Sequence, residues 1–555
     1  MERWGLLTLL VAGVVALLPG IWEMPLLDRD EPRFSQATVE MMERQEWVVP
    51  YFNGQYRFDK PPLTYWWMRL HYHLFSVSEF AARLHSVVAS LLVAIGIYLM
   101  GRRHFNARVG WFAGFAWLTC FQVLQHGRLA LADMPMIAAV FYACWALYEL
   151  VRERGNGRAH RGWFWLLYLS LGIGFLAKGP IAIAIPLVTL LLYRWVWWRH
   201  PLNWKELRPV SGLLVSLMLI AAWGIPALLA TDGLFWKVGV GKHVVDRGLE
   251  AFNERWVIPG YYLLTTFISL FPWMALLGKR LKHLRSDWNP LSAFLVSWLL
   301  SPYLVFLFYS TQLPHYVLPA FPALLIWIMA SFDREDLEWG NLGNRWFWGY
   351  VLFFECLLTA GLIWVLGSHL QLDGVKAALG AMLFLLLLLN ALVVAVRFRV
   401  VWATISLMVL VSLTHLLLAT AMRSLSPVIP VASMLEELPE TSRTVGIGFE
   451  EPSLVFYTGR TWDFDVEPAE LEAEFQSEQA RKTCYVILER EYTIEGLIQE
   501  GWNGKAPEAH REIGIDLRSL AQGTHVVLPV EGINFARMRW SKILVLFPMD
   551  PLPSS

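Results

Sequence analysis

The stretch WFWLLYLSLGIGFLAKGPIAIAIPLVTLLLYRW, residues 163–195, carries a single charged side chain, Lys178, before it reaches Arg194. A helix that crosses a bilayer needs about 20 mainly apolar residues, so a run of this length holds two membrane spans. Because Gly179 and Pro180 directly follow Lys178 and proline interrupts helices, we expect a turn at this point. The stretch therefore predicts a membrane protein with a cation where two of its helices meet.

Similar runs recur through the 555 residues, of which 56% are hydrophobic and only 17% are charged. Soluble chains carry about 25% charged residues, so a soluble enzyme, a disordered chain and a disulfide scaffold are excluded. The net charge of zero gives no overall field that would attract nucleic acid. The thirteen spans that we predict lie near 5–22, 86–100, 109–124, 134–151, 163–177, 179–195, 210–230, 260–278, 291–309, 316–332, 347–367, 374–396 and 400–421.

The distribution of lysine and arginine predicts the orientation in the membrane. With the N-terminus inside, the inside segments hold 20 Lys and Arg residues, and the four short outside loops hold 3. Cytoplasmic loops carry such an excess, so we expect a cytoplasmic N-terminus and, after thirteen spans, a C-terminus outside. We expect the first helix to be a retained anchor, because the end of its run at 17–20 lacks a small-residue cleavage site.

Two outside loops are long, 23–85 and 231–259, and we assign them with the spans to a membrane domain over residues 1–422. The first loop holds two segments, 34–47 and 65–75, that we expect to form helices in the membrane interface. After residue 422 the chain is more polar, with a helical pattern at 467–480 and strand-like segments at 443–449, 484–488, 525–528 and 542–547. Residues 423–555 therefore predict a small α/β domain outside the membrane.

Ionisable side chains gather at the outer membrane boundary. The first loop contains Asp28-Arg29-Asp30-Glu31-Pro32-Arg33 and Asp59-Lys60-Pro61-Pro62, and later outside loops contribute Asp133, Lys178, Lys237, Lys242, His243, Arg247 and Leu313-Pro314-His315-Tyr316. Such residues are costly near lipid and are candidates for function. Their convergence on one side of the membrane predicts a site at its outer face.

These residue types suit the transfer of a sugar from a lipid phosphate. Lysine and arginine bind phosphate and stabilise the charge that develops on a phosphate leaving group. A carboxylate can act as a general base or orient an acceptor. A lipid tail in the bilayer would place its sugar at the outer loops, where these side chains are found.

Structural interpretations of the same residues remain open. Asp30 and Arg33 can form a salt bridge that shapes the loop, and Lys60 can extend its amine to the interface. Asp133 can cap a helix, and Lys178 can be an ordinary turn charge.

A metal site is a further expectation. Asp59, His243 and His315 are oxygen and nitrogen donors of the kind that bind zinc or a similar divalent metal, although no short spacing joins them. The two histidines can equally be ordinary interface residues. We expect no nucleotide cofactor and no nucleic acid partner.

Several of these motifs also occur, in the same order, in a known family. They are Asp30–Phe34, Glu46–Pro50, Asp59–Pro61, Ala132–Asp133, Lys178–Gly179 and Leu313–Tyr316. Over about residues 1–420 the chain thereby resembles bacterial aminoarabinose lipid A transferases, which are GT-C glycosyltransferases similar to protein mannosyltransferases. The resemblance implies thirteen transmembrane helices in the bacterial inner membrane and a periplasmic C-terminal α/β domain. It implies an undecaprenyl phosphate donor carrying 4-amino-4-deoxy-L-arabinose, a lipid A phosphate as acceptor, and inversion at the anomeric carbon.

The resemblance also implies roles for individual residues. Asp30 and Asp133 would be the catalytic carboxylates. The donor phosphate would be bound by Lys60 and Arg247, and Glu450 or Glu451 of the C-terminal domain would face the active site. Among the other charged and aromatic residues at the outer face, we expect Arg33, Lys178 and Tyr316 to bind substrate as well. A metal would be held by Asp59, where the family more usually has glutamate, together with His243 and His315.

Two other functions remain open. A related GT-C transferase could move a hexose or hexosamine to another envelope lipid or protein with the same set of charges. A transporter would place its polar residues at mid-membrane in broken helices, often in repeats. Here the ionisable residues lie in loops, and the sequence shows no internal repeat.

Overall fold

The computed structural model describes residues 4–152, 158–196, 204–239, 258, 260–282, 288–307, 309, 311–330, 400–466, 474–475, 479–493, 511–512 and 521–549. The chain divides into two compact units. The first comprises Met1–Ile21, Trp47–Val49 and Phe58–Leu418, and the second comprises Trp22–Glu46, Pro50–Arg57 and Ala419–Ser555. The second unit thus combines part of the first long loop with the C-terminal segment, a grouping that the sequence did not indicate.

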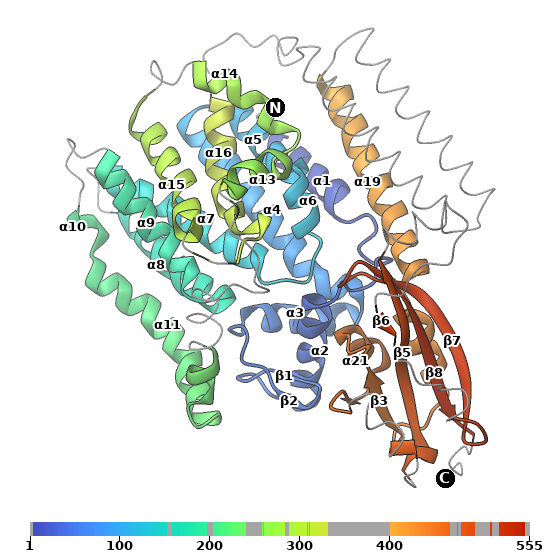
Figure 1. Ribbon diagram of the computed structural model, residues 1–555. Coiled ribbons are helices and arrows are strands. Elements are labelled where there is room, and N and C mark those ends of the chain that lie inside the picture. The colour runs from blue at the N-terminus through green and yellow to red at the C-terminus, as the bar shows by residue number, and fades with distance from the viewer. Residues whose placement is uncertain are drawn as a thin grey trace. The chain divides into compact units, whose positions relative to one another are not determined.

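The first unit is helical (Figure 1). Its elements are α1 (Gly5–Leu17), α3 (Leu63–Phe75), α4 (Glu79–His104), α5 (Ala107–Thr119), α6 (Phe121–His126), α7 (Asp133–Arg152), α8 (Arg158–Lys178), α9 (Ile181–Val196), α10 (Trp204–Leu207), α11 (Pro209–Ala230), α13 (Tyr261–Ser269), η2 (Trp273–Leu276), α14 (Leu277–Lys282), α15 (Pro290–Leu307), η3 (Pro314–Ala320), α16 (Phe321–Met329) and most of α19 (Val400–Leu425). Within the described residues, four helices are long and apolar enough to cross a membrane: α4, α7, Lys205–Ala230 and α15. A fifth is added if Thr414–Leu425 and Val428–Leu435 form one bent span.

The turn predicted after Lys178 is confirmed. Helix α8 ends at Lys178, Gly179 takes a positive φ of 80°, and α9 begins at Ile181. Glycine adopts this left-handed conformation without the steric cost that a Cβ would add. The long apolar run therefore forms two helices, with Lys178 at their junction.

Three other predicted spans are shorter or broken. Helix α1 ends at Leu17, just before Pro19, and the span near 260–278 loses its α-helix at Ser269, just before Pro272. Proline lacks the N–H that a helix interior needs. The span near 109–124 is broken at Cys120, whose backbone is extended. The predicted spans 347–367 and 374–396 lie outside the described residues, so the total of thirteen stays a prediction.

Helices α4 and α5 approach each other closely through two glycines. A Cβ added to Gly101 would lie 2.5 Å from the Cα of Gly110, and one added to Gly110 would lie 2.4 Å from the carbonyl oxygen of Tyr98. Small residues allow membrane helices to pack backbone against backbone. This contact fixes the spacing of the two helices that follow the first long loop.

The substitution Gly110→Val should destabilise the protein by about 2 kcal/mol, because the larger side chain forces the two backbones apart. The apparent melting temperature in detergent measures the effect. Gly162→Val is the matched control, because no atom lies within 4 Å of a Cβ at Gly162. Equal melting temperatures of the two variants would contradict the close packing.

The second unit contains a mixed sheet and short helices (Figure 1). Its elements are α2 (Asp30–Glu43), the hairpin strands β1 (Tyr51–Phe52) and β2 (Gln55–Tyr56), α20 (Val428–Leu435), β3 (Arg443–Ile447), α21 (Pro452–Thr458), β4 (Trp462–Asp463), η7 (Ala480–Lys482), β5 (Thr483–Thr493), β6 (Arg511–Glu512), β7 (His525–Asn534) and β8 (Arg539–Pro548). The large sheet has the order β4-β3-β5-β8-β7, and β6 pairs with β5. Strand β3 is parallel to β4 and β5, whereas β8 is antiparallel to β5 and β7. The four predicted strands are confirmed, whereas most of the predicted helix 467–480 lies outside the described residues.

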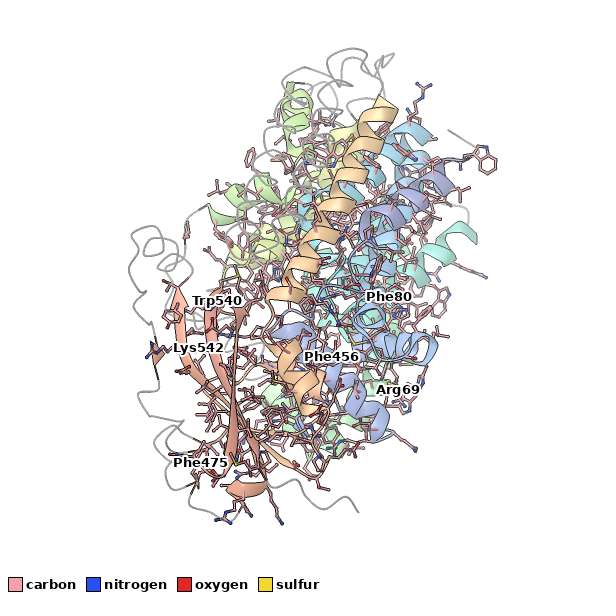
Figure 2. All side chains as sticks on the ribbon, turned by 90° about the vertical axis from the view of Figure 1, so that its right-hand side faces the viewer. Arg69, Phe80, Phe456, Phe475, Trp540 and Lys542 are labelled. Atoms are coloured by element: carbon pink, nitrogen blue, oxygen red, sulfur yellow. The ribbon has the colours of Figure 1, made fainter. Side chains whose placement is uncertain are left out.

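Apolar side chains cover both faces of this sheet. Along β5, Cys484 and Val486 pack in one cluster with α20 and α21, and Tyr485 and Ile487 pack in another. This alternation follows from the two-residue period of a strand. On the second face, the rings of Phe475 and Tyr485 stack with centroids 4.8 Å apart, and Figure 2 shows Phe475 beside the sheet. Both faces of the sheet therefore contribute to the core of the second unit.

Candidate active site

The junction of α8 and α9 brings a lysine to the start of α7. Lys178 Nζ donates a hydrogen bond of 2.6 Å to Oδ1 of Asp133, the first residue of α7. The Asp133 side chain is buried, with 6% of the residue exposed, and Lys178 is half-buried. Removing two charges from water costs free energy that close contact must offset. Lys178 is therefore part of a buried ion pair and not a solvated turn charge.

Helix η3 adds two aromatic side chains to this pair. His315 Nε2 lies 3.8 Å from Asp133 Oδ1, close enough for electrostatic attraction. Lys178 Nζ lies 5.9 Å from the centre of the Tyr316 ring, which itself stacks on Phe306. We call Asp133, Lys178, His315 and Tyr316 the Asp133 cluster. It unites four of the residues that the sequence singled out.

A second histidine, which the sequence analysis missed, contacts this cluster. His126 is the last residue of α6, and its buried ring lies with its centroid 4.5 Å from that of His315. Gln122 Nε2 donates a 2.8 Å hydrogen bond to His126 Nδ1, and Ser269 Oγ donates a 3.0 Å hydrogen bond to Gln122 Oε1. The available signal was the position of His126 in the same short loop as Asp133, a loop that the sequence predicts to lie outside the membrane.

Asp59 and Lys60 form a second acid–base pair in the first unit. Lys60 Nζ donates a 2.9 Å hydrogen bond to Asp59 Oδ1. Both side chains are half-buried. The preceding residue, Phe58, packs edge-to-face on Phe235, which does the same on Trp223. An ion pair thus lies next to an aromatic cluster in the first unit.

The remaining predicted residues belong to the second unit or lie outside the described residues. Asp30 is the exposed first residue of α2, and Arg33 follows in the first turn with a half-buried side chain. Glu450 is exposed. Its neighbour Glu451 is buried, accepts a 2.8 Å hydrogen bond from Asn534 and pairs with Arg537 at 3.2 Å, so Glu451 has a structural role. His243 and Arg247 lie outside the described residues.

Asp28 fixes the segment that precedes α2. Its Oδ1 accepts a 2.8 Å hydrogen bond from the Ser453 N–H, and its Oδ2 accepts one of 2.5 Å from the Ser453 hydroxyl. The Leu26 N–H also donates to the Tyr457 hydroxyl over 2.8 Å. These bonds join the start of the first loop to α21 within the second unit. They hold the chain two residues before Asp30.

Asp28 should make the stability of the second unit depend on pH. Burial, and secondarily the negative charge of Glu451, raise the pKa of the Asp28 carboxyl from 3.8 to about 7, although hydrogen bonds from Ser453 oppose this rise. Between these two values the folded protein keeps a proton that the unfolded chain has released. Stability should therefore fall as pH rises from about 4 to about 7.

The substitution Asp28→Asn should flatten this part of the profile, because an amide does not titrate. The measurement is the apparent melting temperature from pH 4 to pH 8, compared between wild type and variant. Asp465→Asn, at an exposed position of the same unit, is the control. An unchanged slope in Asp28→Asn would assign the pH dependence to another group.

The predicted metal ligands are only partly covered by the structure. Asp59 and His315 lie in the described ranges, and His243 does not. In those ranges, no three His, Cys, Asp or Glu side chains lie close enough together to hold a metal ion. The divalent metal remains a prediction that depends on His243.

Solved structures define the class of the fold. The structure of ArnT from Cupriavidus metallidurans bound to undecaprenyl phosphate matches with a TM-score of 0.75 over 100% of this chain and 99% of that one, at 18% sequence identity. An oligosaccharyltransferase from Archaeoglobus fulgidus matches with a TM-score of 0.50 over 88% of this chain and 70% of that one, at 12% identity. The protein therefore has the GT-C membrane fold of ArnT, with a C-terminal sheet domain.

Sequence relatives narrow the class further. Residues 59–225 match the family of dolichyl-phosphate-mannose-protein mannosyltransferases. The undecaprenyl phosphate-alpha-4-amino-4-deoxy-L-arabinose arabinosyl transferase of Edwardsiella ictaluri is 30% identical over 339 residues, which are 60% of this chain and 59% of that protein. The Aeromonas hydrophila enzyme of the same name is 28% identical, over 64% of each chain. The chain spans about three fifths of the length of these relatives, and the resemblance to aminoarabinose transferases is confirmed.

Proposed function

We propose that this protein transfers 4-amino-4-deoxy-L-arabinose from undecaprenyl phosphate to a phosphate of lipid A. The reaction takes place at the periplasmic face of the bacterial inner membrane, on a chain with thirteen spans and a cytoplasmic N-terminus. The observation that carries the proposal is the buried Asp133–Lys178 pair, in a chain similar to transferases named for this donor. Undecaprenyl phosphate also occupies the ArnT whose fold this chain shares.

The charges of the described residues suit an amino sugar. The donor carries one negative charge on its phosphodiester and one positive charge on its amine. The first unit offers two acid–base pairs, Asp133–Lys178 and Asp59–Lys60. A carboxylate can accept hydrogen bonds from the sugar ammonium while an ammonium binds the phosphate. A neutral hexose can donate hydroxyl hydrogen bonds to the same carboxylates but has no positive charge to pair with them, and this difference favours the aminoarabinose donor.

The chemical step is a displacement at the anomeric carbon. An oxygen of the acceptor phosphate attacks C1 of the sugar, the bond from C1 to the donor phosphate breaks, and undecaprenyl phosphate leaves with the electron pair. Lys60, Lys178 and Arg247 would stabilise the charge on the leaving phosphate. The attacking phosphate is already an anion, so Asp30 would orient it and need not remove a proton.

A purified-enzyme assay with three donors tests the proposal. The protein, in lipid nanodiscs with lipid A, receives undecaprenyl phosphate linked to aminoarabinose, to N-acetylated aminoarabinose or to a hexose. Mass spectrometry should show lipid A heavier by one aminopentose with the first donor only. Transfer of the hexose alone would overturn the choice of sugar. Uptake of labelled substrate into vesicles without any covalent product would instead support a transporter.

A further inference from the structure

We propose that His126, held by Gln122 and Ser269, is a positioning residue that sets the orientation of His315 beside Asp133. The inference rests on the proposed function for its kinetic test and on the described geometry for its spectroscopic test. It adds to the Asp133 cluster three buried polar residues that are joined by hydrogen bonds, His126 and Gln122 of α6 and Ser269 of α13. None of these three residues stood out in the sequence.

The polar groups form a continuous series across five elements. Ser269 of α13 donates to Gln122 of α6 over 3.0 Å, and Gln122 donates to His126 over 2.8 Å. The ring of His126 faces that of His315 of η3, which lies 3.8 Å from Asp133 of α7, and Asp133 pairs with Lys178 of α8. Contacts of α6 with α13 and with η3, and of η3 with α7, hold these elements together.

The bonds define the orientation of the His126 ring. The Ser269 hydroxyl donates its hydrogen bond to Oε1 of Gln122. The other end of the amide, Nε2, faces His126. An amide nitrogen can only donate, and Nδ1 of His126 must therefore accept. A neutral ring then carries its proton on Nε2. The three residues are only 2% (Ser269), 7% (Gln122) and 9% (His126) exposed, so water does not compete strongly for these bonds.

The ring contact transmits this orientation to His315. Two rings with centroids 4.5 Å apart and planes inclined by 37° lie at the short end of the range for aromatic pairs. His315 cannot turn toward that side without displacing His126, which its own hydrogen bond holds. The edge that bears Nε2 of His315 therefore stays directed at Asp133. A misplacement of about 1 Å at such a site lowers a reaction rate substantially.

The kinetic test uses three variants and one control. The single variant His126→Phe keeps an aromatic ring but loses the bond to Gln122, and Ser269→Ala removes the first bond of the series. In the single variant His126→Phe, the buried amide of Gln122 loses its partner, which can destabilise the protein. The double variant, with His126→Phe and Gln122→Leu, removes this amide as well. Ser301→Ala is the control, because Ser301 is also a buried serine but bonds to Thr189 of α9.

We expect both His126→Phe and the double variant to lower kcat about tenfold, with less than about a twofold change in the KM for the donor. Ser269→Ala should lower kcat less, and Ser301→Ala should leave both constants unchanged. Variants that melt like wild type yet keep full kcat would overturn the inference. An equal loss of kcat in Ser301→Ala would show a packing effect and would also overturn it.

A spectroscopic test does not depend on activity. Solid-state NMR of protein labelled with 15N-histidine in bilayers reports the protonated nitrogen of each ring, and His126→Phe and His315→Phe identify the two signals. Gln122→Leu should shift the His126 resonances and, through the ring contact, those of His315. If wild type transfers no sugar, the proposed function fails, and the NMR result still decides the positioning role. Unmoved His315 resonances would exclude it.

Discussion

The substitution Asp133→Asn should lower the rate of sugar transfer about 10²- to 10³-fold, because it removes a charge that we expect to act in a site with little water. Asp133 is the shared member of the Asp133 cluster, since its carboxylate accepts the hydrogen bond from Lys178 and lies 3.8 Å from His315. The assay is transfer from undecaprenyl phosphate aminoarabinose to lipid A, quantified by mass spectrometry.

A folding defect must be separated from this loss of activity. Asp133→Asn leaves the Lys178 ammonium half-buried without its counter-ion, which by itself destabilises the protein. A double variant with Lys178→Met removes both charges and should recover the melting temperature without recovering activity. Asp232→Asn, at an exposed position of the same unit, is the neutral control. Activity of Asp133→Asn within about twofold of wild type would assign the pair to structure alone.

The second large effect is expected at Asp30. Asp30→Asn should lower transfer by about 10²-fold while the protein inserts and folds, because the variant loses the exposed carboxylate that we propose to orient the acceptor. Glu43→Gln is the matched control, since Glu43 is an exposed acid at the other end of the same helix. Full activity of Asp30→Asn would exclude a role of Asp30 in the reaction. The remaining interpretation of Asp30 would be a salt bridge with Arg33 that shapes the loop.

Local patterns were sufficient to predict much of the fold. Lys178-Gly179-Pro180 predicted the junction of α8 and α9 because glycine and proline act on the backbone at their own position. Strand β5 was recognisable because Cys484 to Leu488 form a continuous apolar run, as expected of a strand covered on both faces. Each of these signals lies within a few residues of its effect.

Contacts between distant segments were harder to predict. His126 has no charge pattern around it, and its importance comes from a ring contact with a residue that lies far along the chain. The bond between Asp28 and Ser453 joins residues 425 positions apart. Neither contact leaves a periodic or compositional signal, so the sequence did not indicate His126 beside the Asp133 cluster or the union of the first loop with the C-terminal segment.

The union of Trp22–Glu46 with the C-terminal segment has a consequence for synthesis. A ribosome adds about 5–20 residues per second, so Asp28 is translated roughly 20–85 s before Ser453. For nearly all of that interval α2 has been made and its partner α21 has not. The segment that bears Asp30 can therefore reach its final form only after Ser453 has been translated, and a nascent chain that stalls before that residue leaves it without this support.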